Sequence, residues 1–290
     1  MKQIASNWLD YELLDCGDGY KLERWKDIIL SRPDPQAIWP EYQPKIWTKA
    51  DAKYIRSNSG GGHWEFKNRI SDHWNITYQD LTFKVSPTGF KHTGIFPEQA
   101  ANWDYMYNTI KASQRDDLRI LNLFAYTGGA TLACSAAGAA EVVHLDASKG
   151  ILKWAKENAE LSHLNNQCIR YINDDALKFI AREKRRGRQY DGIVMDPPSY
   201  GRGPNNEVWK IEEQLIPLIE GCLDILSDDA LFMIVNCYTT GFSATVLDNV
   251  MHSLIDKKRH GIITSGENCL PISGSSTLLP CGIYSRYENK

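Results

Sequence analysis

The sequence predicts an α/β fold in which a small β-rich annex precedes a doubly wound, mainly parallel sheet of seven strands. Two observations carry this prediction. From residue 118 onward, apolar segments of strand length alternate with segments of helix length, which is typical of βαβ crossovers. The segment 118–130, LRILNLFAYTGGA, joins an apolar strand, a Gly-Gly turn and the start of a small-residue helix. Open α/β sheets bind nucleotide-like ligands at such junctions.

This change of pattern predicts two domains, residues 1–90 and 91–290. In the first, GDG at 17–19 is a hairpin signal between YELLDC and YKLERW. The prolines of 32–40 indicate a structured loop or sheet edge, and SNSGGGHW at 57–64 indicates a flexible loop or the tip of a small domain. Residues 74–88 alternate enough to form two strands. Residues 91–110 then run from a turn into a helix, expected over 98–112.

The elements of the second domain follow in order. Strands are expected over 118–124, 141–146, 168–172, 190–196, 230–236, 261–265 and 279–286. Helices are expected over 129–138, 148–161, 175–186, 207–226 and 243–258. The last two strands have no helix between them, so they can pair antiparallel through a loop rich in Gly, Pro and Ser, 266–277.

Composition is ordinary for a soluble globular protein, with 42% apolar and 24% charged residues. The net charge of −3 argues against a dedicated nonspecific nucleic-acid binder, so any contact with nucleic acid should be local. The seven cysteines are scattered without CxxC spacing, which predicts reduced thiols, a cytoplasmic location and no structural metal. No apolar run is long enough to predict a membrane span. The oligomeric state is not specified.

Two features mark a candidate ligand site at the first turn. AYTGGA lacks the GxGxxG pattern of dinucleotide-binding folds, so this turn is either a ligand loop or a simple strand-to-helix connection. Its glycines would let the backbone approach a ligand closely. Asp146 ends the next strand, where an acid can accept both hydroxyls of a ribose. Asp146 or Ser148 can also cap the following helix, and the two roles are compatible.

Acidic residues also end the third and fourth strands. Asp174 and Asp175 can meet an adenine amino group or cap the following helix. Asp196-Pro197-Pro198-Ser199 is the more specific signal, because two prolines fix the backbone and remove two N–H donors. They leave carbonyl groups and a carboxylate at the edge of the sheet. Such a rigid set of acceptors suits a planar ring or an amino group held for reaction.

At these residues the chain resembles a known family. NLFAYTGGATLA, VVHLDASKGILKWAKENAEL, NDDALKFI and YDGIVMDPPSYGRG are similar to class I S-adenosylmethionine-dependent methyltransferases. With HTGIFPEQAANWDYM, they most resemble the large-subunit ribosomal RNA cytosine-5 methyltransferase group. The resemblance covers the second domain and implies a Rossmann-like methyltransferase sheet with S-adenosyl-L-methionine as cofactor. The RNA-binding PUA domain usual in that group is not recognisable in residues 1–60.

The resemblance also implies roles for single residues. Those matching cofactor-binding positions are Phe124, Tyr126, Thr127 and Gly128 in the first loop, Asp146, Ala147 and Ser148 after the second strand, Asp174, Asp175 and Ala176 near adenine, and His92, Thr93, Phe96 and Gln99 in a segment that folds over the cofactor. Those matching the catalytic edge are Asp196, Pro197 and Pro198.

One departure from the family concerns the nucleophile. Cytosine-5 methylation needs a thiolate that attacks C6 of the ring. Family members carry this Cys in a Ser-Cys-Ser-like loop after the fifth strand, where this chain reads IVNCYTTGFS. The best register places Thr239 at the family Cys, with Cys237 nearby. Cys237 is therefore either the nucleophile or a buried Cys at a strand end. Without a thiolate, the acceptor would be an exocyclic nitrogen or another unactivated group.

The predicted function is methyl transfer from S-adenosylmethionine to a base of RNA, with ribosomal RNA as the leading substrate. A base inside a helix must be flipped out to reach such a site. The basic segment 181–188 either contacts RNA phosphates or complements a helix dipole. The alternatives are a methyltransferase for a small molecule or protein, and a cofactor-binding protein that has lost catalysis. A nicotinamide-dependent oxidoreductase would leave Asp-Pro-Pro unexplained.

Overall fold

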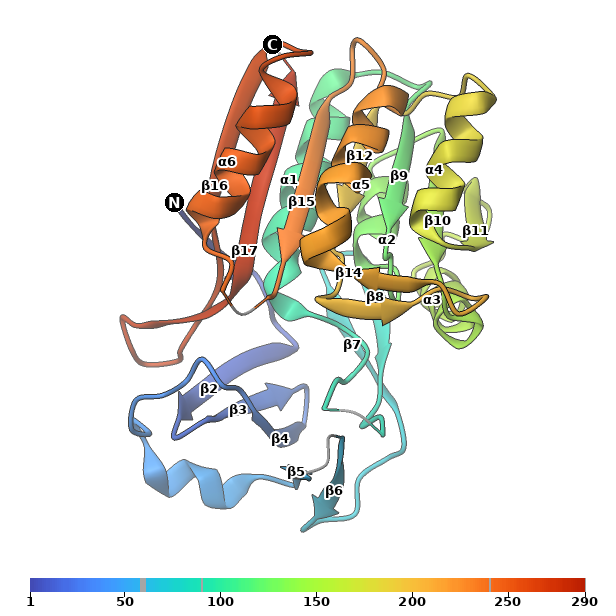
Figure 1. Ribbon diagram of the computed structural model, residues 1–290. Coiled ribbons are helices and arrows are strands. Elements are labelled where there is room, and N and C mark those ends of the chain that lie inside the picture. Colours follow the sequence, from blue (N-terminus) through green and yellow to red (C-terminus); the bar gives the residue numbers. More distant parts are fainter. Residues whose placement is uncertain (58–60, 90, 240, 290) are drawn as a thin grey trace. The chain divides into compact units, whose positions relative to one another are not determined.

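The computed structural model describes residues 1–57, 61–89, 91–239 and 241–289, and its chain forms two compact units (Figure 1). Unit 1 comprises Met1–Gln3, Asn102–Asn268 and the segment from Gly282 onward. Unit 2 comprises Ile4–Ala101 and Cys269–Cys281. The predicted domain boundary between residues 90 and 91 stays a prediction.

Unit 1 is built on an α/β sheet of the predicted type. Its strand order is β1-β16-β17-β15-β12-β9-β10-β11. The strands span β1 (Lys2–Ile4), β9 (Arg119–Leu123), β10 (Glu141–Asp146), β11 (Ile169–Asn173), β12 (Gly192–Met195), β15 (Phe232–Cys237), β16 (Gly261–Pro271) and β17 (Leu278–Asn289). The neighbours from β15 to β11 pair in parallel, and β17 runs antiparallel to β15. The inner parallel strands β9, β10, β12 and β15 are mostly buried, which explains their largely apolar sequences, whereas the edge strand β11 is half-buried.

The predicted strand count of seven is wrong, because this sheet has eight strands. The additional strand is β1, which lies beside β16 at the edge of the sheet. Gly266 makes this pairing possible, since a Cβ atom there would lie 1.9 Å from the carbonyl oxygen of Met1. Residues 2–4 are too few to produce a sequence signal of their own.

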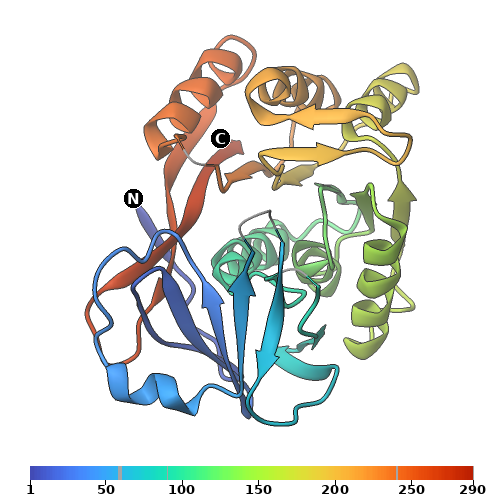
Figure 2. The same ribbon diagram turned by 60° about the horizontal axis from the view of Figure 1, so that its bottom comes forward.

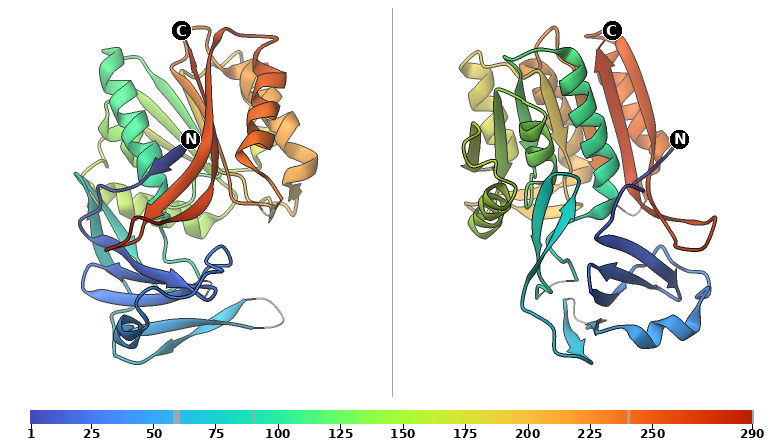
Figure 3. Two further views of the ribbon diagram at one scale, coloured as in Figure 1. Left: turned by 90° about the vertical axis from the view of Figure 1, so that its left-hand side faces the viewer. Right: turned by 180° about the vertical axis from the view of Figure 1, so that it is seen from behind.

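Helices cover both faces of this sheet, as a doubly wound fold requires. They are α1 (Ala100–Ser113), α2 (Gly129–Ala136), α3 (Lys149–Leu161), α4 (Ala176–Arg185), α5 (Ile211–Ile225) and α6 (Ala244–Ile255). Figure 3 shows α1, α2 and α3 on one face and α4, α5 and α6 on the other. Ser148, Asp175 and Ser243 accept backbone N–H groups at the starts of α3, α4 and α6, which is why these three helices begin where they do.

Two predicted boundaries are wrong for related reasons. The expected loop 266–277 is mostly strand, since β16 continues to Pro271 and only residues 272–277 lie between β16 and β17. The expected helix 207–226 begins only at Ile211. A short antiparallel hairpin of β13 (Tyr200–Arg202) and β14 (Val208–Lys210) precedes it and is visible in Figure 2. In both places residues expected in a loop or a helix belong instead to paired strands.

Unit 2 is rich in β-structure, as predicted. One sheet has the order β2-β3-β4-β5-β6, and β7 pairs with β8. The strands span β2 (Tyr11–Gly17), β3 (Tyr20–Trp25), β4 (Ile28–Pro33), β5 (Ala52–Arg56), β6 (Gly62–Phe66), β7 (Trp74–Tyr78) and β8 (Leu81–Val85), with 3-10 turns at Pro44–Lys49 and Pro97–Gln99. The hairpin at GDG and the two strands within 74–88 are confirmed. The predicted loop 57–64 lies partly outside the described residues.

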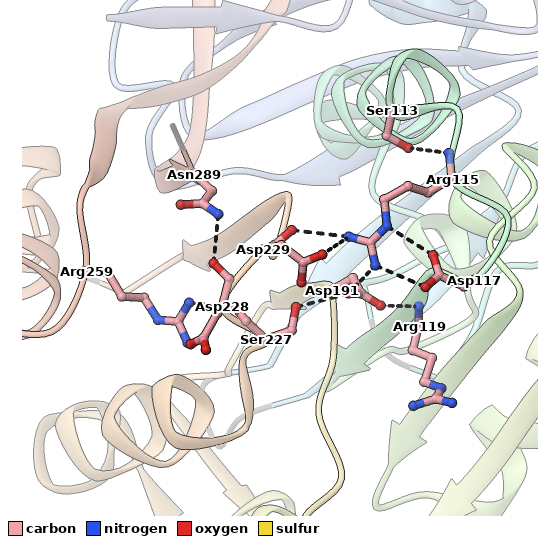
Figure 4. A network of polar contacts seen from close by, with 10 residues as sticks. All are labelled: Ser113, Arg115, Asp117, Arg119, Asp191, Ser227, Asp228, Asp229, Arg259 and Asn289. Carbon is pink, nitrogen blue, oxygen red and sulfur yellow. Dashed lines mark hydrogen bonds and ion pairs between the residues drawn. The ribbon is translucent and has the colours of Figure 1, made fainter.

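A polar network fixes the starts of three strands in unit 1 (Figure 4). Asp191 immediately precedes β12 and its carboxylate accepts from the backbone N–H of Arg119 at 2.8 Å, from the Arg115 guanidinium at 3.0 Å and from the Ser227 hydroxyl at 3.0 Å. Arg115 also pairs with Asp117 and Asp229. Asp191 thereby joins the start of β9 to the segment before β15. This network lies at the edge where the strands begin, so it holds the sheet in register.

The Asp191 carboxylate gives a stability prediction. Asp191→Ala should lower the free energy of unfolding by about 2–3 kcal/mol, because it leaves a backbone N–H, a hydroxyl and a guanidinium without their shared acceptor. Asp229→Ala is the matched control, since the Asp229 side chain is 75% exposed and its pair with Arg115 should contribute less than about 1 kcal/mol. Urea unfolding of both variants measures the difference. Equal losses would contradict the structural role of Asp191.

Candidate functional site

The parallel strands of unit 1 bring most of the predicted site residues to one edge of the sheet. Strands β9, β10, β11, β12 and β15 all end at this edge, here called the carboxyl edge. Next to it lie the loop 124–128, Asp146, the turn 174–176, the segment 196–199 and residues 237–239. Ligands bind at the carboxyl edge in open α/β sheets.

The first loop has an unusual backbone. Phe124 and Tyr126 have φ angles of 53° and 50°, in the left-handed region that side chains other than glycine rarely adopt. Gly128 follows with φ 97° at the N-cap of α2. The side-chain amide of Asn158, which is fully buried in α3, donates to the Thr127 carbonyl oxygen at 2.9 Å. Strained backbone of this kind gathers at ligand sites, where the surrounding structure enforces it.

Gly128 and Gly129 of this turn exclude a side chain for different physical reasons, one conformational and one steric. Gly128 needs its positive φ angle. At Gly129 a Cβ atom would lie 2.3 Å from the Trp103 ring of α1. The sequence predicted that glycines here let the backbone approach a ligand. At Gly129 the group that approaches the backbone closely is the Trp103 ring. Sequence reasoning missed Trp103 and Asn158, because each lies in a helix far along the chain from the turn that it supports.

Asp146 is held in a fixed orientation across this loop. Its two carboxylate oxygens accept the backbone N–H groups of Tyr126 at 3.0 Å and of Ser148 at 2.9 Å. Burial raises the pKa of Asp146, while the hydrogen bonds from Ser148, Tyr126 and Ala147 lower it. Each carboxylate oxygen has a second lone pair, and this poorly hydrated carboxylate gains most from further donors. A pair of neighbouring hydroxyls, as on a ribose, fits this requirement.

The two acids at the end of β11 make hydrogen bonds and an ion pair at the start of helix α4. Asp175 is the N-cap of α4 and accepts the Lys178 backbone N–H at 3.0 Å. Asp174 accepts the backbone N–H of Asp175 at 2.8 Å and pairs with the Arg182 guanidinium. Ala176 is buried at the first turn of α4. Both acids therefore have local structural partners, and a role near adenine stays a prediction.

The Asp-Pro-Pro segment leaves β12 at the carboxyl edge. Pro197 is buried, Asp196 is half-buried and Pro198 is exposed. The Pro198 carbonyl oxygen, expected to be presented to a substrate, instead accepts the indole N–H of Trp209 at 2.6 Å. Because Trp209 already donates to the Pro198 carbonyl oxygen, the Asp196 carboxylate is the stronger candidate for an acceptor that contacts the substrate.

Cys237 is the last residue of β15 and is only 2% exposed. Burial is the main cause that raises the pKa of its thiol, and the neighbouring Asp196 carboxylate raises it further. Both effects oppose formation of a thiolate. Thr239, which the resemblance predicts at the family Cys position, lies with its hydroxyl oxygen 2.8 Å from that of Ser199. This contact links the loops after β12 and β15.

The remaining predicted cofactor residues, His92, Thr93, Phe96 and Gln99, belong to unit 2, and their role stays a prediction. Within that unit the His92 and Phe96 rings meet edge to face, 5.2 Å apart between centroids. Burial lowers the pKa of His92 from 6.5 to about 3. The Thr93 hydroxyl is buried and has no hydrogen-bond partner among the described residues.

A buried histidine lies behind the first loop. The His144 Nδ1 atom is 2.8 Å from the Thr131 hydroxyl, which accepts from the Asn122 amide at 2.9 Å. Burial lowers the pKa of His144 from 6.5 to about 3, so the ring is neutral in the folded protein. This chain of polar groups connects β9, α2 and β10 directly beneath Gly128, whose added Cβ would lie 3.6 Å from His144 Cε1.

His144 predicts an acid-sensitive fold. Between pH 6.5 and about 3 the unfolded chain binds a proton at this residue and the folded chain does not, so its contribution is complete above 6.5 and is lost as the pH falls. The loss should approach about 1.4 kcal/mol per pH unit. Urea unfolding of the wild type and His144→Asn at neutral and mildly acidic pH measures it. The stability difference between the two proteins should shrink on acidification, and a constant difference would contradict the prediction.

Two negative findings hold for the described residues. No helix among them is long and apolar enough to cross a membrane. Within the same part of the chain, no group of three or more His, Cys, Asp or Glu side chains is arranged to hold a metal ion.

Comparison with known proteins gives consistent matches. The sequence pattern of the S-adenosylmethionine-dependent methyltransferase family matches residues 53–216. The crystal structure of an S-adenosylmethionine-dependent methyltransferase from Agrobacterium tumefaciens is 37% identical with a TM-score of 0.95, covering 100% of this chain and 94% of that one. The structure of SMU.776 in complex with S-adenosylhomocysteine shares the fold, with 18% identity, a TM-score of 0.75 and coverage of 97% and 76%.

One relative with a similar sequence is named as a ribosomal RNA methyltransferase. Ribosomal RNA large subunit methyltransferase K from Neisseria meningitidis serogroup B is 28% identical over 247 residues, which are 81% of this chain. The match spans 66% of that relative's length, which is slightly less than two thirds.

Proposed function

The chain belongs to the S-adenosylmethionine-dependent methyltransferase family, and we propose that it transfers the methyl group to an exocyclic nitrogen of a base in RNA, with ribosomal RNA as the first substrate to test. The name of the Neisseria relative and the resemblance of segments 92–106, 122–133 and 190–203 support an RNA substrate. The observation that carries the choice of acceptor atom is the position of Cys237, which is buried beside a carboxylate.

We assign the cofactor to the carboxyl edge between the first loop and Asp146. When bound, S-adenosylmethionine supplies an electrophilic methyl group on its sulfonium. Asp146 would accept the two ribose hydroxyls through the lone pairs that Tyr126 and Ser148 leave over. The loop 124–128 and the first N–H groups of α2 would surround the rest of the cofactor. The resemblance of the sequence implies a cofactor role also for His92, Thr93, Phe96 and Gln99 and for the turn 174–176, and we keep these residues in the proposal on that ground alone.

Asp196 would act on the acceptor. Its carboxylate can accept an N–H of the exocyclic amino group, which orients the nitrogen lone pair and stabilises the positive charge that develops as the new C–N bond forms. Pro197 and Pro198 restrict the backbone, and the bond from Trp209 to the Pro198 carbonyl oxygen holds that backbone further. Alignment of the two reacting atoms can supply much of the rate without a covalent intermediate.

The cytosine-5 mechanism is the competing proposal, and Cys237→Ala separates the two. If Cys237 is structural, the variant should keep methyl transfer within about threefold of the wild type, because removing one buried sulfur costs stability rather than chemistry. If Cys237 is the nucleophile, transfer should be lost altogether. Thermal unfolding of the variant accompanies the assay, so that a folding defect is recognised.

The substrate class is tested by following labelled methyl groups. Wild type and Cys237→Ala are incubated with labelled S-adenosylmethionine and unmodified large-subunit ribosomal RNA, which is then digested to nucleosides. Label in an amino-methylated nucleoside in both proteins supports the proposal. Label in 5-methylcytidine that disappears in the variant supports the cytosine-5 mechanism. No label in RNA, with cofactor binding confirmed by calorimetry, favours a small-molecule or protein substrate or a protein without catalysis.

A further inference from the structure

The hairpin β13–β14 follows the Asp-Pro-Pro segment directly and has two different faces. Its register pairs Tyr200 with Lys210, Gly201 with Trp209, and Arg202 with Val208. Because directly opposed residues of antiparallel strands share a face, and successive residues alternate, the first and third pairs lie on one face. Gly201 and Trp209 lie on the other. Figures 1 and 2 show this hairpin beside the carboxyl edge.

The inner face attaches the hairpin to the candidate site. Trp209 is only 5% exposed, donates to the Pro198 carbonyl oxygen and packs against the Phe124 ring with 4.9 Å between centroids. A Cβ atom at Gly201 would be 3.4 Å from Pro198 Cγ, so this position has little room. Lys178 of α4 pairs with Glu207 at the other end of the hairpin, 2.6 Å apart. The hairpin is thus held between the first loop and α4.

The outer face presents groups that the fold does not use. Tyr200 is 55% exposed and Val208 is 43% exposed. Arg202 is exposed, and the structure records no acidic partner for it among the described residues. An aromatic ring kept in water next to a candidate catalytic segment contributes little to stability. Lys210, which pairs with Glu213, adds a second cation to this face.

The basic helix end, the other expected site for phosphate, is less suitable. Within 182–188 most cations are engaged with acids: Arg182 with Asp174, Lys184 with Asp224, Arg186 with Glu183, and Arg188 with Glu141. These pairs favour the structural interpretation of that segment. On the outer face of the hairpin, by contrast, the exposed ring of Tyr200 lies two positions from Arg202, a cation that is not paired with an acid among the described residues. Proteins bind single-stranded nucleic acid with this combination of an aromatic ring and a cation.

We propose that the outer face of β13–β14 binds single-stranded RNA beside the target base, with the Tyr200 ring stacked on a neighbouring base and the Arg202 guanidinium paired with a phosphate. This inference rests on the proposed function, since it names how an RNA substrate is held. The inner face fixes the distance from this platform to Asp196 through Pro198. A base flipped from its stack exposes neighbours that need a new stacking partner, and the Tyr200 ring provides one.

The test compares Tyr200→Ala, Tyr200→Phe and Arg202→Gln with Lys257→Gln, an exposed cation outside the hairpin. Binding to unmodified large-subunit ribosomal RNA is measured at several salt concentrations, cofactor binding by calorimetry, and methyl transfer as kcat and KM. Tyr200→Ala should weaken RNA binding about tenfold and raise KM, with cofactor affinity unchanged, and Tyr200→Phe should restore both. Arg202→Gln should reduce the salt dependence by the equivalent of about one phosphate contact. Lys257→Gln should behave as wild type.

The outcomes separate this inference from the proposed function. If the wild type methylates RNA but Tyr200→Ala and Arg202→Gln bind and methylate it normally, the hairpin platform is wrong and the RNA substrate stands. An equal effect of Lys257→Gln would also overturn the platform, since it would indicate nonspecific charge. If the wild type neither binds nor methylates RNA, the proposed function fails and the platform fails with it. A protein substrate that loses methylation in Tyr200→Ala would place a different partner on this face.

Discussion

Asp146→Ala is expected to weaken S-adenosylmethionine binding by about two to four orders of magnitude. Two hydrogen bonds from ribose hydroxyls to a carboxylate contribute about 1.5–3 kcal/mol each, and each 1.4 kcal/mol corresponds to tenfold in affinity. The burial that raises the pKa of Asp146 makes these donors more valuable, because water does not replace them well. Titration calorimetry with S-adenosylmethionine and S-adenosylhomocysteine measures the change.

Asp146 also accepts the backbone N–H groups of Tyr126 and Ser148, so a loss of affinity could come from a disordered loop. Asp146→Asn distinguishes the two causes, because it retains the size and one acceptor oxygen but removes the charge. We expect it to bind more tightly than Asp146→Ala and more weakly than the wild type. Glu160→Ala, an exposed acid on α3, is the control. Affinity of Asp146→Ala within threefold of the wild type would refute the ribose assignment.

The sequence predicted the parallel part of the sheet well because burial on both faces leaves a strong signal. Strands β9, β10, β12 and β15 are apolar runs, and β10 matches its predicted range to the residue. Capping residues located the starts of α3 and α4, since Ser148 and Asp175 act through local hydrogen bonds. Predictions of this kind succeed where the cause of the structure lies within a few residues of its effect.

The missed features have causes that lie far apart in the sequence. The hairpin β13–β14 has strands of three residues, too short for a recognisable alternation, and it is fixed by Trp209 against Pro198 and Phe124. The accessibility of Cys237 depends on which side of β15 it faces and on what covers that side, neither of which its neighbours in sequence specify. The chemistry at Asp196 was suggested by a local motif, whereas the hydrogen bond from Trp209 to the Pro198 carbonyl oxygen was visible only in the structure.

Asp196→Ala should reduce kcat for methyl transfer by at least about 10²-fold while S-adenosylmethionine affinity stays within about threefold. The reason is that the carboxylate acts on the acceptor nitrogen, where stabilisation of developing charge is commonly worth 10²–10³ in rate. The assay is labelled methyl transfer to unmodified large-subunit ribosomal RNA, with cofactor binding measured separately by calorimetry. Glu212→Gln, an exposed acid at the start of α5, should leave both quantities unchanged.

Asp196→Asn sharpens this test, because it keeps an acceptor oxygen in place and removes the negative charge. If orientation of the amino group matters most, Asp196→Asn should retain much of the activity that Asp196→Ala loses. If charge stabilisation matters most, the two variants should be similarly slow. Removing the charge should also relieve one of the two effects that raise the pKa of Cys237. Full activity in Asp196→Ala would contradict the catalytic assignment, and the acceptor would have to be held by groups other than the acid of the Asp-Pro-Pro segment.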